Sequence, residues 1–274
     1  MSERLAGMPR SVVERAKLVR LGDTQVPTLL AHPDWQTPAP VVLWMHGRTV
    51  NKELDPGRYA RWLRAGVGVC AIDLPGHGER GDARPSDPAN SLALIEEALG
   101  EIDSVIDALS IHDGVFDQDR LGIGGMSLGG MVALRRLCEP HTFKAASVEA
   151  TTGSLEHLYL PGPDGKSWPV KHDPARVKQL DPAAHLAEWR AIPVQVLHSE
   201  ADEMVPWATQ ERFVGLLRER YEEVGSDPSL VEVRTWPETG APSEHIGFGR
   251  ESNEAKTLQV EFWVRHLAPV GFVG

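Results

Sequence analysis

Cysteine is scarce in this chain, which has only Cys70 and Cys138 among its 274 residues. Two cysteines cannot build the disulfide framework of a small secreted domain, and no group of cysteines and histidines has the spacing of a zinc site. Cys70 lies in an apolar run and Cys138 lies near the end of a predicted helix. We therefore expect two buried free thiols, and we expect the protein to need no metal and no other cofactor.

Long apolar runs and positive charge are also in short supply. No run approaches the roughly 20 apolar residues that span a bilayer, and the N-terminal segment MSERLAGMPRSVVERAK lacks the apolar centre of a signal peptide. The 28 Lys and Arg residues are outnumbered by 39 Asp and Glu residues, for a formal net charge of −11, and they form no basic stripe. These features disfavour membranes and nucleic acids as partners. The sequence predicts a cytoplasmic protein that acts on a small, neutral molecule, and it leaves the oligomeric state open.

The chain does contain a regular alternation of short apolar runs and helical patterns, without internal repeats. Runs of strand length, rich in Val, Ile and Leu, lie at residues 14–22, 25–33, 40–47, 66–73, 120–126, 144–150, 193–199 and 230–236. Apolar residues recur at helical spacing over residues 57–66, 91–109, 127–138, 208–224 and 254–267. The first two runs predict a hairpin. The alternation predicts an α/β fold whose doubly wound, mostly parallel sheet of eight strands carries helices on both faces.

Residues 151–190 interrupt this alternation. The segment holds many Pro and Gly residues and only short helical stretches. We predict a single domain over residues 1–274, in which residues 151–190 form a small lid inserted above the sheet.

Five glycines surround Ser127 in the stretch LGIGGMSLGG, residues 121–130. A glycine cluster marks a place where the backbone takes a positive φ or approaches another segment closely. The stretch lacks the GxxxxGK[ST] pattern of a phosphate loop and fits a GxGxxG dinucleotide turn poorly. It does contain GxSxG, from Gly125 to Gly129, between a predicted strand and a predicted helix. That context is typical of a nucleophile elbow and predicts Ser127 as a catalytic nucleophile.

A serine nucleophile needs a base that takes its proton and an acid that orients the base. On this topology the acid and then the histidine follow the nucleophile, each after a later strand. The loop EADEMVP offers Glu200, Asp202 and Glu203; we prefer Asp202, which lies where the loop turns toward the sheet, and keep the two glutamates as alternatives. The loop after the last predicted strand has a single histidine, His245, which we predict to be the base.

Acyl transfer also needs hydrogen-bond donors for the oxyanion of its transition state. We expect these donors to be the backbone N–H groups of Leu128, directly after the nucleophile, and of Arg48, in the turn after the strand at 40–47. For the substrate pocket we expect side chains from the predicted lid, namely Leu155, Leu158, Tyr159, Leu160 and Trp168. The Arg48 side chain is unusual at this place. Its role stays open between pairing with a substrate carboxylate and being an ordinary solvated or salt-bridged arginine.

Five segments carry a resemblance to a known superfamily: WMHGR (44–48), DLPGHGER (73–80), DQDRLGIGGMSLGG (117–130), IPVQVLHSEADEMVP (192–206) and SEHIGF (243–248). Over residues 25–268 the chain resembles serine hydrolases of the α/β-hydrolase superfamily, in the branch of the dienelactone hydrolases and the prolyl-oligopeptidase-like esterases. The resemblance implies that Ser127 is the nucleophile, Asp202 the acid and His245 the base.

The same resemblance assigns the oxyanion hole to the backbone of Arg48 and Leu128, although the chain has HGRT where the hormone-sensitive-lipase branch has HGGG. Dienelactone hydrolases have Cys at the elbow, and epoxide hydrolases and haloalkane dehalogenases have Asp, so Ser127 argues against those reactions. Peptide-cleaving relatives usually carry a propeller or a large N-terminal extension, whereas about 25 residues precede the core here.

These features predict a serine hydrolase that cleaves carboxylic esters of small to medium acyl chains through a covalent acyl-enzyme. A peptidase or amidase of the prolyl-oligopeptidase-like type would use the same residues, and a non-catalytic binding protein on the same fold is the third class. Parallel assays on p-nitrophenyl esters and aminoacyl anilides distinguish the first two classes.

Overall fold

The structure, a computed structural model, describes residues 3–111, 114–162 and 168–267. In these ranges eight strands form one sheet: β1 (Ala16–Leu21), β2 (Val26–Ala31), β3 (Ala39–Met45), β4 (Gly68–Ile72), β5 (Phe116–Met126), β6 (Ala145–Glu149), β7 (Val194–Ser199) and β8 (Val231–Trp236). The α-helices are α1 (Arg10–Val13), α2 (Pro56–Arg64), α3 (Ser91–Ile111), α4 (Leu128–Arg136), α5 (Leu155–Tyr159), α6 (Pro174–Leu180), α7 (Trp207–Glu223) and α8 (Ser252–Leu267). The 3-10 helices are η1 (Glu3–Leu5), η2 (Gly78–Arg80), η3 (Arg84–Ser86), η4 (Pro88–Asn90), η5 (Pro182–Glu188), η6 (Pro228–Leu230), η7 (Pro242–Glu244) and η8 (Gly249–Glu251).

The strands follow the order β1-β2-β4-β3-β5-β6-β7-β8 across the sheet. β2 runs antiparallel to β1 and β4, and all other neighbours in this order are parallel. From β3 the chain moves to β4 on one side and then to β5 on the other. In open α/β sheets a ligand binds beyond the carboxyl ends of the strands at such a reversal. Met45, at the end of β3, pairs with Gly125 of β5, so the loops after these two strands lie next to each other at that place.

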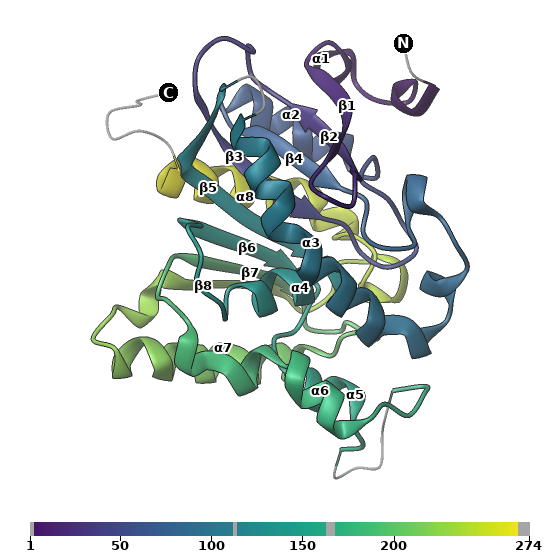
Figure 1. Cartoon of the computed structure of the whole chain (residues 1–274). Coiled ribbons are helices and arrows are strands. Elements are labelled where there is room, and N and C mark those ends of the chain that lie inside the picture. Colours follow the sequence, from purple (N-terminus) through teal and green to yellow (C-terminus); the bar gives the residue numbers. More distant parts are fainter. Residues whose placement is uncertain (1–2, 112–113, 163–167, 268–274) are drawn as a thin grey trace.

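Helices cover both faces of the sheet (Figure 1), with α3, α4 and α7 on one face and α2 and α8 on the other. Side chains alternate between the two faces along a strand. In β3, Leu43 and Met45 therefore belong to the core under α3 and α4, whereas Val42 and Trp44 belong to the core under α2 and α8. Because both faces are covered, β3 is buried at every position. These features confirm the predicted doubly wound, mostly parallel sheet and its opening hairpin.

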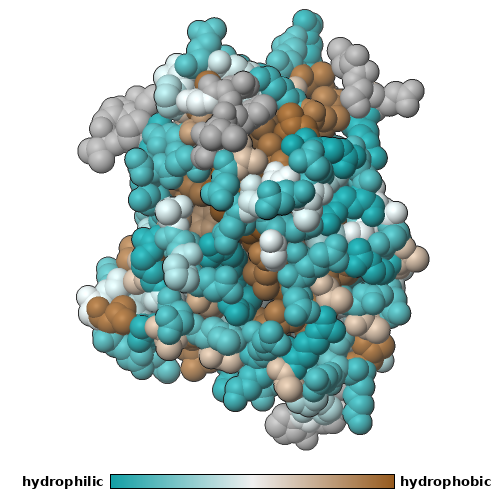
Figure 2. Space-filling view, in the orientation of Figure 1, coloured by the Kyte–Doolittle hydropathy of each residue, from teal (hydrophilic) through white to brown (hydrophobic). Residues whose placement is uncertain are grey.

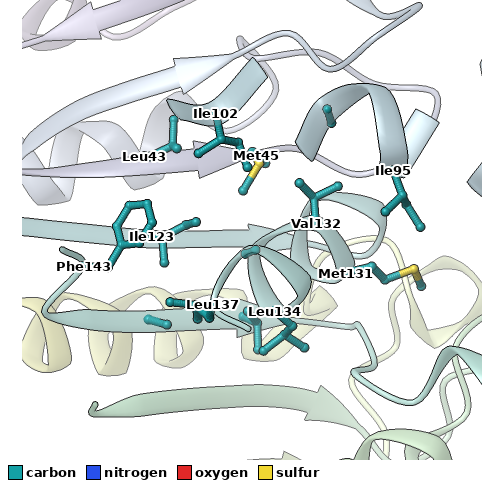
Figure 3. Close-up of a cluster of buried hydrophobic side chains, with 14 of the residues drawn as sticks. Leu43, Met45, Ile95, Ile102, Ile123, Met131, Val132, Leu134, Leu137 and Phe143 are labelled. Atoms are coloured by element: carbon teal, nitrogen blue, oxygen red, sulfur yellow. The ribbon is translucent and has the colours of Figure 1, made fainter. Parts of the chain in front are cut away.

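The core under α3 and α4 fixes the start of α4 against the sheet. Figure 3 shows this cluster, with Leu43, Met45, Ile95, Ile102, Ile123, Met131, Val132, Leu134, Leu137 and Phe143 labelled. Full burial of one such side chain contributes about 1.5–3 kcal/mol relative to an exposed position. Since α4 begins directly after Ser127, the packing of its apolar face also fixes the position of that serine.

The segment 151–190 contains α5, α6 and η5. Asp181 joins these parts, because its carboxylate accepts hydrogen bonds from Leu155 N at 2.9 Å and Glu156 N at 3.2 Å at the start of α5. Residues 163–167 of the predicted lid, and both ends of the predicted domain, lie outside the described residues. The division into one domain with an inserted lid stays a prediction.

Hydrophilic residues cover most of the face shown in Figure 2, and hydrophobic residues occur between them in small groups. Among the residues that the structure describes, the large hydrophobic side chains that remain exposed are Leu54, Met204, Val224 and Ile246. None of the described helices has the length and apolar character that crossing a bilayer requires.

Candidate active site

Ser127 lies in a sharp turn between β5 and α4, with φ 51° and ψ −118°. A non-glycine residue at positive φ is strained, and such residues occur where surrounding structure holds them for function. The turn requires glycine on both sides. A Cβ atom on Gly125 would lie 2.5 Å from the carbonyl carbon of Gly129, and a Cβ atom on Gly129 would collide with the backbone of Met45. The GxSxG spacing is therefore a steric requirement of this turn.

Neighbouring backbone and side chains hold the Ser127 peptide on both sides. Ser127 N donates to the carbonyl oxygen of Glu149, at the end of β6, at 2.9 Å. Thr151 Oγ1 donates to the carbonyl oxygen of Ser127 at 2.7 Å. The strained turn is thus tied to the adjacent strand rather than free to relax.

The structure brings together the three residues that the sequence predicts as a catalytic set. His245 Nε2 lies 2.9 Å from Ser127 Oγ, and His245 Nδ1 lies 2.8 Å from Asp202 Oδ2. The three residues are 5–9% exposed. They come from loops after β5, β7 and β8, which the strand order places on one edge of the sheet. This geometry allows the imidazole to take a proton from the serine hydroxyl while the carboxylate orients the ring.

Asp202 is held by its own loop. Its Oδ1 accepts hydrogen bonds from Met204 N and Val205 N, both at 2.8 Å, which leaves Oδ2 for His245. His198 Nε2 lies 3.5 Å from the same Oδ2 and 2.9 Å from the carbonyl oxygen of Val205, and burial lowers the pKa of this histidine. The carboxylate therefore has one orientation, set by two backbone N–H groups.

The two alternative acids do not reach His245. Glu200 is exposed and accepts a hydrogen bond from Thr235 Oγ1 at 2.6 Å. Glu203 is exposed, and its backbone N–H donates to the carbonyl oxygen of Ser243. Of the three acids in this loop, the structure brings only Asp202 to the histidine.

Glu244, directly before the histidine, was not expected from the sequence as a site residue. Its carboxylate accepts hydrogen bonds from Thr239 N at 2.6 Å, Gly240 N at 2.6 Å and Ser199 Oγ at 2.7 Å. The backbone hydrogen bond from Thr239 is the main reason that the pKa of Glu244 is lowered to about 2. The carboxylate thus ties the histidine loop to the end of β7. The sequence carries no signal for this role beyond the position of an acid next to His245.

The turn after β3 is braced by two histidines. His46 Nδ1 donates to the carbonyl oxygen of Gly47 at 2.7 Å, and its Nε2 accepts from Leu74 N at 3.1 Å. His77 Nε2 accepts from Thr49 N at 3.1 Å, and its Nδ1 donates to a carbonyl oxygen at 2.8 Å. Burial lowers the pKa of both rings, that of His46 to about 4, so both are neutral at neutral pH. Each ring can therefore donate from one nitrogen and accept at the other.

This bracing orients one of the two N–H groups that we predict as oxyanion donors, that of Arg48. In a trans peptide the N–H points away from the C=O. The bond from His46 to the Gly47 carbonyl therefore sets the direction of the Arg48 N–H. Within the ranges that the structure describes, neither Arg48 N nor Leu128 N donates to a protein acceptor. Both residues line the same cavity as Ser127, so both N–H groups are available to a ligand.

Acid is expected to destabilise the protein as the pH falls from about 6.5 to about 4. The pKa of His46 is 6.5 in an ordinary setting and about 4 in the fold, where burial lowers it. Between these values the unfolded chain binds a proton that the folded chain does not, so the contribution to stability is full above pH 6.5 and is lost as the pH falls toward 4. Thermal unfolding followed by circular dichroism should show Tm falling over this window.

The variant His46→Gln provides the control for this pH effect. Glutamine does not titrate and cannot reproduce both ring hydrogen bonds. We expect a lower Tm than wild type at pH 7.5 and a smaller fall in Tm toward pH 4.5. The same fall in both proteins would assign the acid sensitivity to other groups.

A cavity of about 180 Å³ opens at Ser127 and is lined mostly by apolar side chains. Tyr159 and Trp168, which we expected in the pocket, line it. Leu158 lines a second cavity of about 540 Å³ that shares Trp168 with the first. Leu155 and Leu160 line neither of these two cavities. The expectation for Leu155 was wrong, because the short helix α5 directs this side chain into the core, where it is fully buried.

Most of the apolar wall comes from residues that the sequence did not identify. Met126, Met131 and Met204 contribute three thioether side chains, and Leu54 and Ile246 lie at the cavity as two of the exposed hydrophobic residues. Met126 precedes Ser127 and Ile246 follows His245, so their positions were a usable signal. Leu54 carries no such signal, because it is adjacent to no predicted catalytic residue.

No group of three or more His, Cys, Asp or Glu side chains in the described parts of the chain is arranged to hold a metal ion. Cys70 and Cys138 are buried and free, as expected. Burial raises the pKa of both thiols to about 12. Neither thiol is therefore a ready nucleophile at neutral pH.

Comparison with known proteins places this site in a family context. The profile of the prolyl oligopeptidase family matches residues 57–269. Esterase YjfP of Escherichia coli is 24% identical over 216 residues, which are 75% of this chain and 85% of that protein. The structure of TT1662 from Thermus thermophilus aligns with a TM-score of 0.66 at 21% identity, over 91% of this chain and 98% of its own. An acylaminoacyl peptidase of Pyrococcus horikoshii aligns with a TM-score of 0.73 at 18% identity, over 93% of this chain but 42% of the peptidase chain. At these identities the structural alignments show a shared fold.

Proposed function

Because the chain belongs to the prolyl oligopeptidase family and is a serine hydrolase with the α/β-hydrolase fold, we propose that it is a carboxylesterase with Ser127 as nucleophile. In this proposal His245 is the general base and Asp202 is the acid that orients it. The observation that carries the proposal is the continuous hydrogen-bonded line from Ser127 Oγ through His245 to Asp202 at the wall of an apolar cavity.

The first half of the reaction forms the acyl-enzyme. Ser127 Oγ attacks the ester carbonyl carbon while His245 Nε2 takes the hydroxyl proton, and the carbonyl oxygen becomes an oxyanion. The backbone N–H groups of Arg48 and Leu128 donate to that oxyanion. His245 then gives its proton to the leaving alcohol oxygen as the carbon–oxygen bond of the ester breaks.

The second half releases the acid. Water attacks the acyl carbon, and His245 Nε2 takes one of its protons. The bond from the acyl carbon to Ser127 Oγ breaks, and the proton returns to the serine. Asp202 stays ionised throughout and stabilises the imidazolium that forms twice in each cycle.

The volume of the cavity favours an ester with a short acyl chain. A protein cavity of roughly 150 Å³ accepts benzene, so the 180 Å³ at Ser127 has room for about the same small number of carbon atoms. Unbranched thioether side chains adapt to ligands of different shape, which favours a range of small apolar groups over one rigid substrate. We further propose that residues 151–190 act as the lid of this cavity, since Tyr159 and Trp168 line it.

The family name and the acylaminoacyl peptidase likeness keep peptide cleavage as the second candidate. An exopeptidase that binds a free N-terminal ammonium group needs a carboxylate in its pocket. The described residues that line the cavity at Ser127 include no Asp and no Glu, and they include the cation Arg48. This charge pattern disfavours a peptide substrate with a free ammonium group. The name of the Escherichia coli relative supports the ester.

A substrate series tests the proposal. Among the p-nitrophenyl esters, we expect kcat/KM to be highest for the butyrate. It should be lower for the acetate ester, because less apolar area is buried, and lower for the octanoate ester, because its acyl chain is too long for the cavity. We expect aminoacyl p-nitroanilides to be cleaved at least about 100-fold more slowly, measured by the release of p-nitroaniline as the esters are by the release of p-nitrophenolate. Faster cleavage of the anilides would make the protein a peptidase, and no cleavage of either class would support a non-catalytic protein.

A further inference from the structure

The Arg48 side chain lies at the boundary of both cavities near Ser127. It lines the cavity that contains the nucleophile and the larger cavity next to it. Its guanidinium carbon lies 5.7 Å from the centre of the Trp168 ring, and its Nη1 lies 3.5 Å from Ser91 Oγ, at the limit of a hydrogen bond. Arg48 is half-buried, so its charge is only partly solvated.

No carboxylate of the described residues pairs with Arg48. The structure pairs its buried cations differently: Lys52 lies 2.8 Å from Asp73, and Arg58 lies 2.5 Å from Glu149. The buried Arg136 likewise lies 2.6 Å from a carboxylate, that of Asp103. Removing a cation from water costs free energy unless an anion or hydrogen bonds replace the water. The Arg48 guanidinium is therefore available to bind an anion in the cavity that the proposed substrate occupies.

The cavity at Ser127 adds no competing negative charge, whereas the larger cavity has one acid among its lining residues, the exposed Glu203. The residues that line the cavity at Ser127 include no Asp and no Glu. Burial raises the pKa of Tyr159 to about 12, so this phenol stays neutral. The protein as a whole carries a net charge of −11 and repels anions, so an anionic substrate needs a local cation where it binds.

We propose that Arg48 binds a carboxylate of the substrate, so that the preferred substrates are esters carrying one carboxylate. This inference rests on the proposed esterase function and narrows its substrate class. A single guanidinium presents two parallel N–H donors that match one carboxylate. A phosphate dianion would require further positive charge, which the described wall does not supply. The Trp168 ring beside the guanidinium restricts its orientation.

The length of the Arg48 side chain limits where the carboxylate lies. The same residue provides the proposed oxyanion N–H and the guanidinium. With bonds near 1.5 Å, the side chain reaches about 6 Å from its backbone N–H. The carboxylate must therefore lie two or three methylene groups from the ester, either in the acyl part or in the alcohol part.

Matched pairs of esters test this assignment in both parts. In the acyl part, mono-p-nitrophenyl glutarate is compared with p-nitrophenyl valerate, which has a methyl group in place of the carboxylate. In the alcohol part, 4-(butyryloxy)butanoate is compared with butyl butyrate, with acid release followed in a pH-stat. For each pair the readout is the ratio of kcat/KM for the anionic ester to that for the neutral ester, in which a partial loss of folded protein cancels.

We expect Arg48→Gln to lower this ratio about 10- to 100-fold in at least one pair, the effect of losing a hydrogen bond to a charged group. Arg48→Lys keeps the charge but not the two parallel donors, and we expect an intermediate ratio. Arg10→Gln is the matched control. It also removes one positive charge, but Arg10 lies on α1, is exposed and pairs with Glu14. Its ratio should equal that of wild type.

Binding of glutarate to the Ser127→Ala variant, measured by calorimetry, separates this inference from the proposed function. Binding that weakens at least about 10-fold in the double variant Ser127→Ala/Arg48→Gln supports the carboxylate site even if no ester is hydrolysed. Ester hydrolysis with ratios that Arg48→Gln does not change would overturn the carboxylate site and leave the esterase proposal standing. If the protein hydrolyses no ester and its binding of glutarate does not depend on Arg48, both proposals are overturned.

Discussion

Replacing Ser127 with alanine is expected to lower kcat for p-nitrophenyl butyrate by about 10⁵- to 10⁶-fold, because the covalent route through the acyl-enzyme is lost. A fluorophosphonate probe should label wild type and leave the variant unlabelled. His245→Ala should have a similar effect on kcat, since the hydroxyl without its base is a weak nucleophile. In residues that act as one unit the losses do not add, so the double variant should be no slower than either single variant.

The fold of these variants is expected to survive, which makes the kinetic result interpretable. Ser127 Oγ makes its hydrogen bond to His245, whereas the elbow itself is held by the backbone of Ser127 and by Thr151. Ser127→Ala should therefore have a Tm within a few degrees of wild type. Equal labelling of wild type and Ser127→Ala, or a double variant slower than both single variants by a further large factor, would contradict the shared role of the two residues.

The sheet and its helices were predictable from the sequence because burial on two faces leaves a strong pattern. β3 is buried at every position, so its residues form the continuous apolar run from which the strand was predicted. β5 was predicted less well, since it begins at Phe116 and its next four residues, DQDR (117–120), are polar and partly or fully exposed. These four residues lie at an irregularity between the paired Phe116 and Leu121, and a polar segment of this kind has no apolar pattern to mark it as part of a strand.

The arrangement of the three proposed catalytic residues was predictable because the strand order determines which loops lie together. The strand order places the ends of β5, β7 and β8 on one edge, so polar residues in the loops after these strands were strong candidates. The pocket was not predictable in the same way. Leu155 and Tyr159 lie on one short helix, yet Leu155 is in the core and Tyr159 at the cavity. The start of that helix is set by Asp181, a contact between distant residues that single-sequence patterns do not contain.

Arg48 has no acidic partner among the described residues, and the sequence alone could not predict this. The sequence shows an arginine after His46 and Gly47, and it leaves open whether an acid pairs with it. Many acids occur in the chain, and the pairing depends on which of them the fold brings near. In the described structure, acids pair with cations other than Arg48; Glu149, for example, pairs with Arg58. Only three-dimensional packing distinguishes a paired arginine from one that is available to a ligand.

Asp202→Asn is expected to lower kcat about 10⁴-fold, the size of effect known for an acid-to-amide change in such a triad. The structure explains why the amide would adopt the inactive orientation. Met204 N and Val205 N both donate to the Oδ1 position, so the asparagine oxygen must occupy it. The amide NH₂ then faces His245 Nδ1 and donates to it. The imidazole is forced to carry its proton on Nε2, where it cannot accept the proton of Ser127.

The matched control for this change is Glu200→Gln, an acid-to-amide change two residues away. Glu200 is exposed and bonded to Thr235, so kcat and KM should stay within about two-fold of wild type. A second readout distinguishes a wrong tautomer from a damaged fold. Slow fluorophosphonate labelling with an unchanged Tm would indicate the wrong tautomer, whereas a large fall in Tm would indicate loss of the loop held by Met204 N and Val205 N. A kcat for Asp202→Asn close to wild type, together with a large loss in Glu200→Gln, would assign the acid to Glu200 instead.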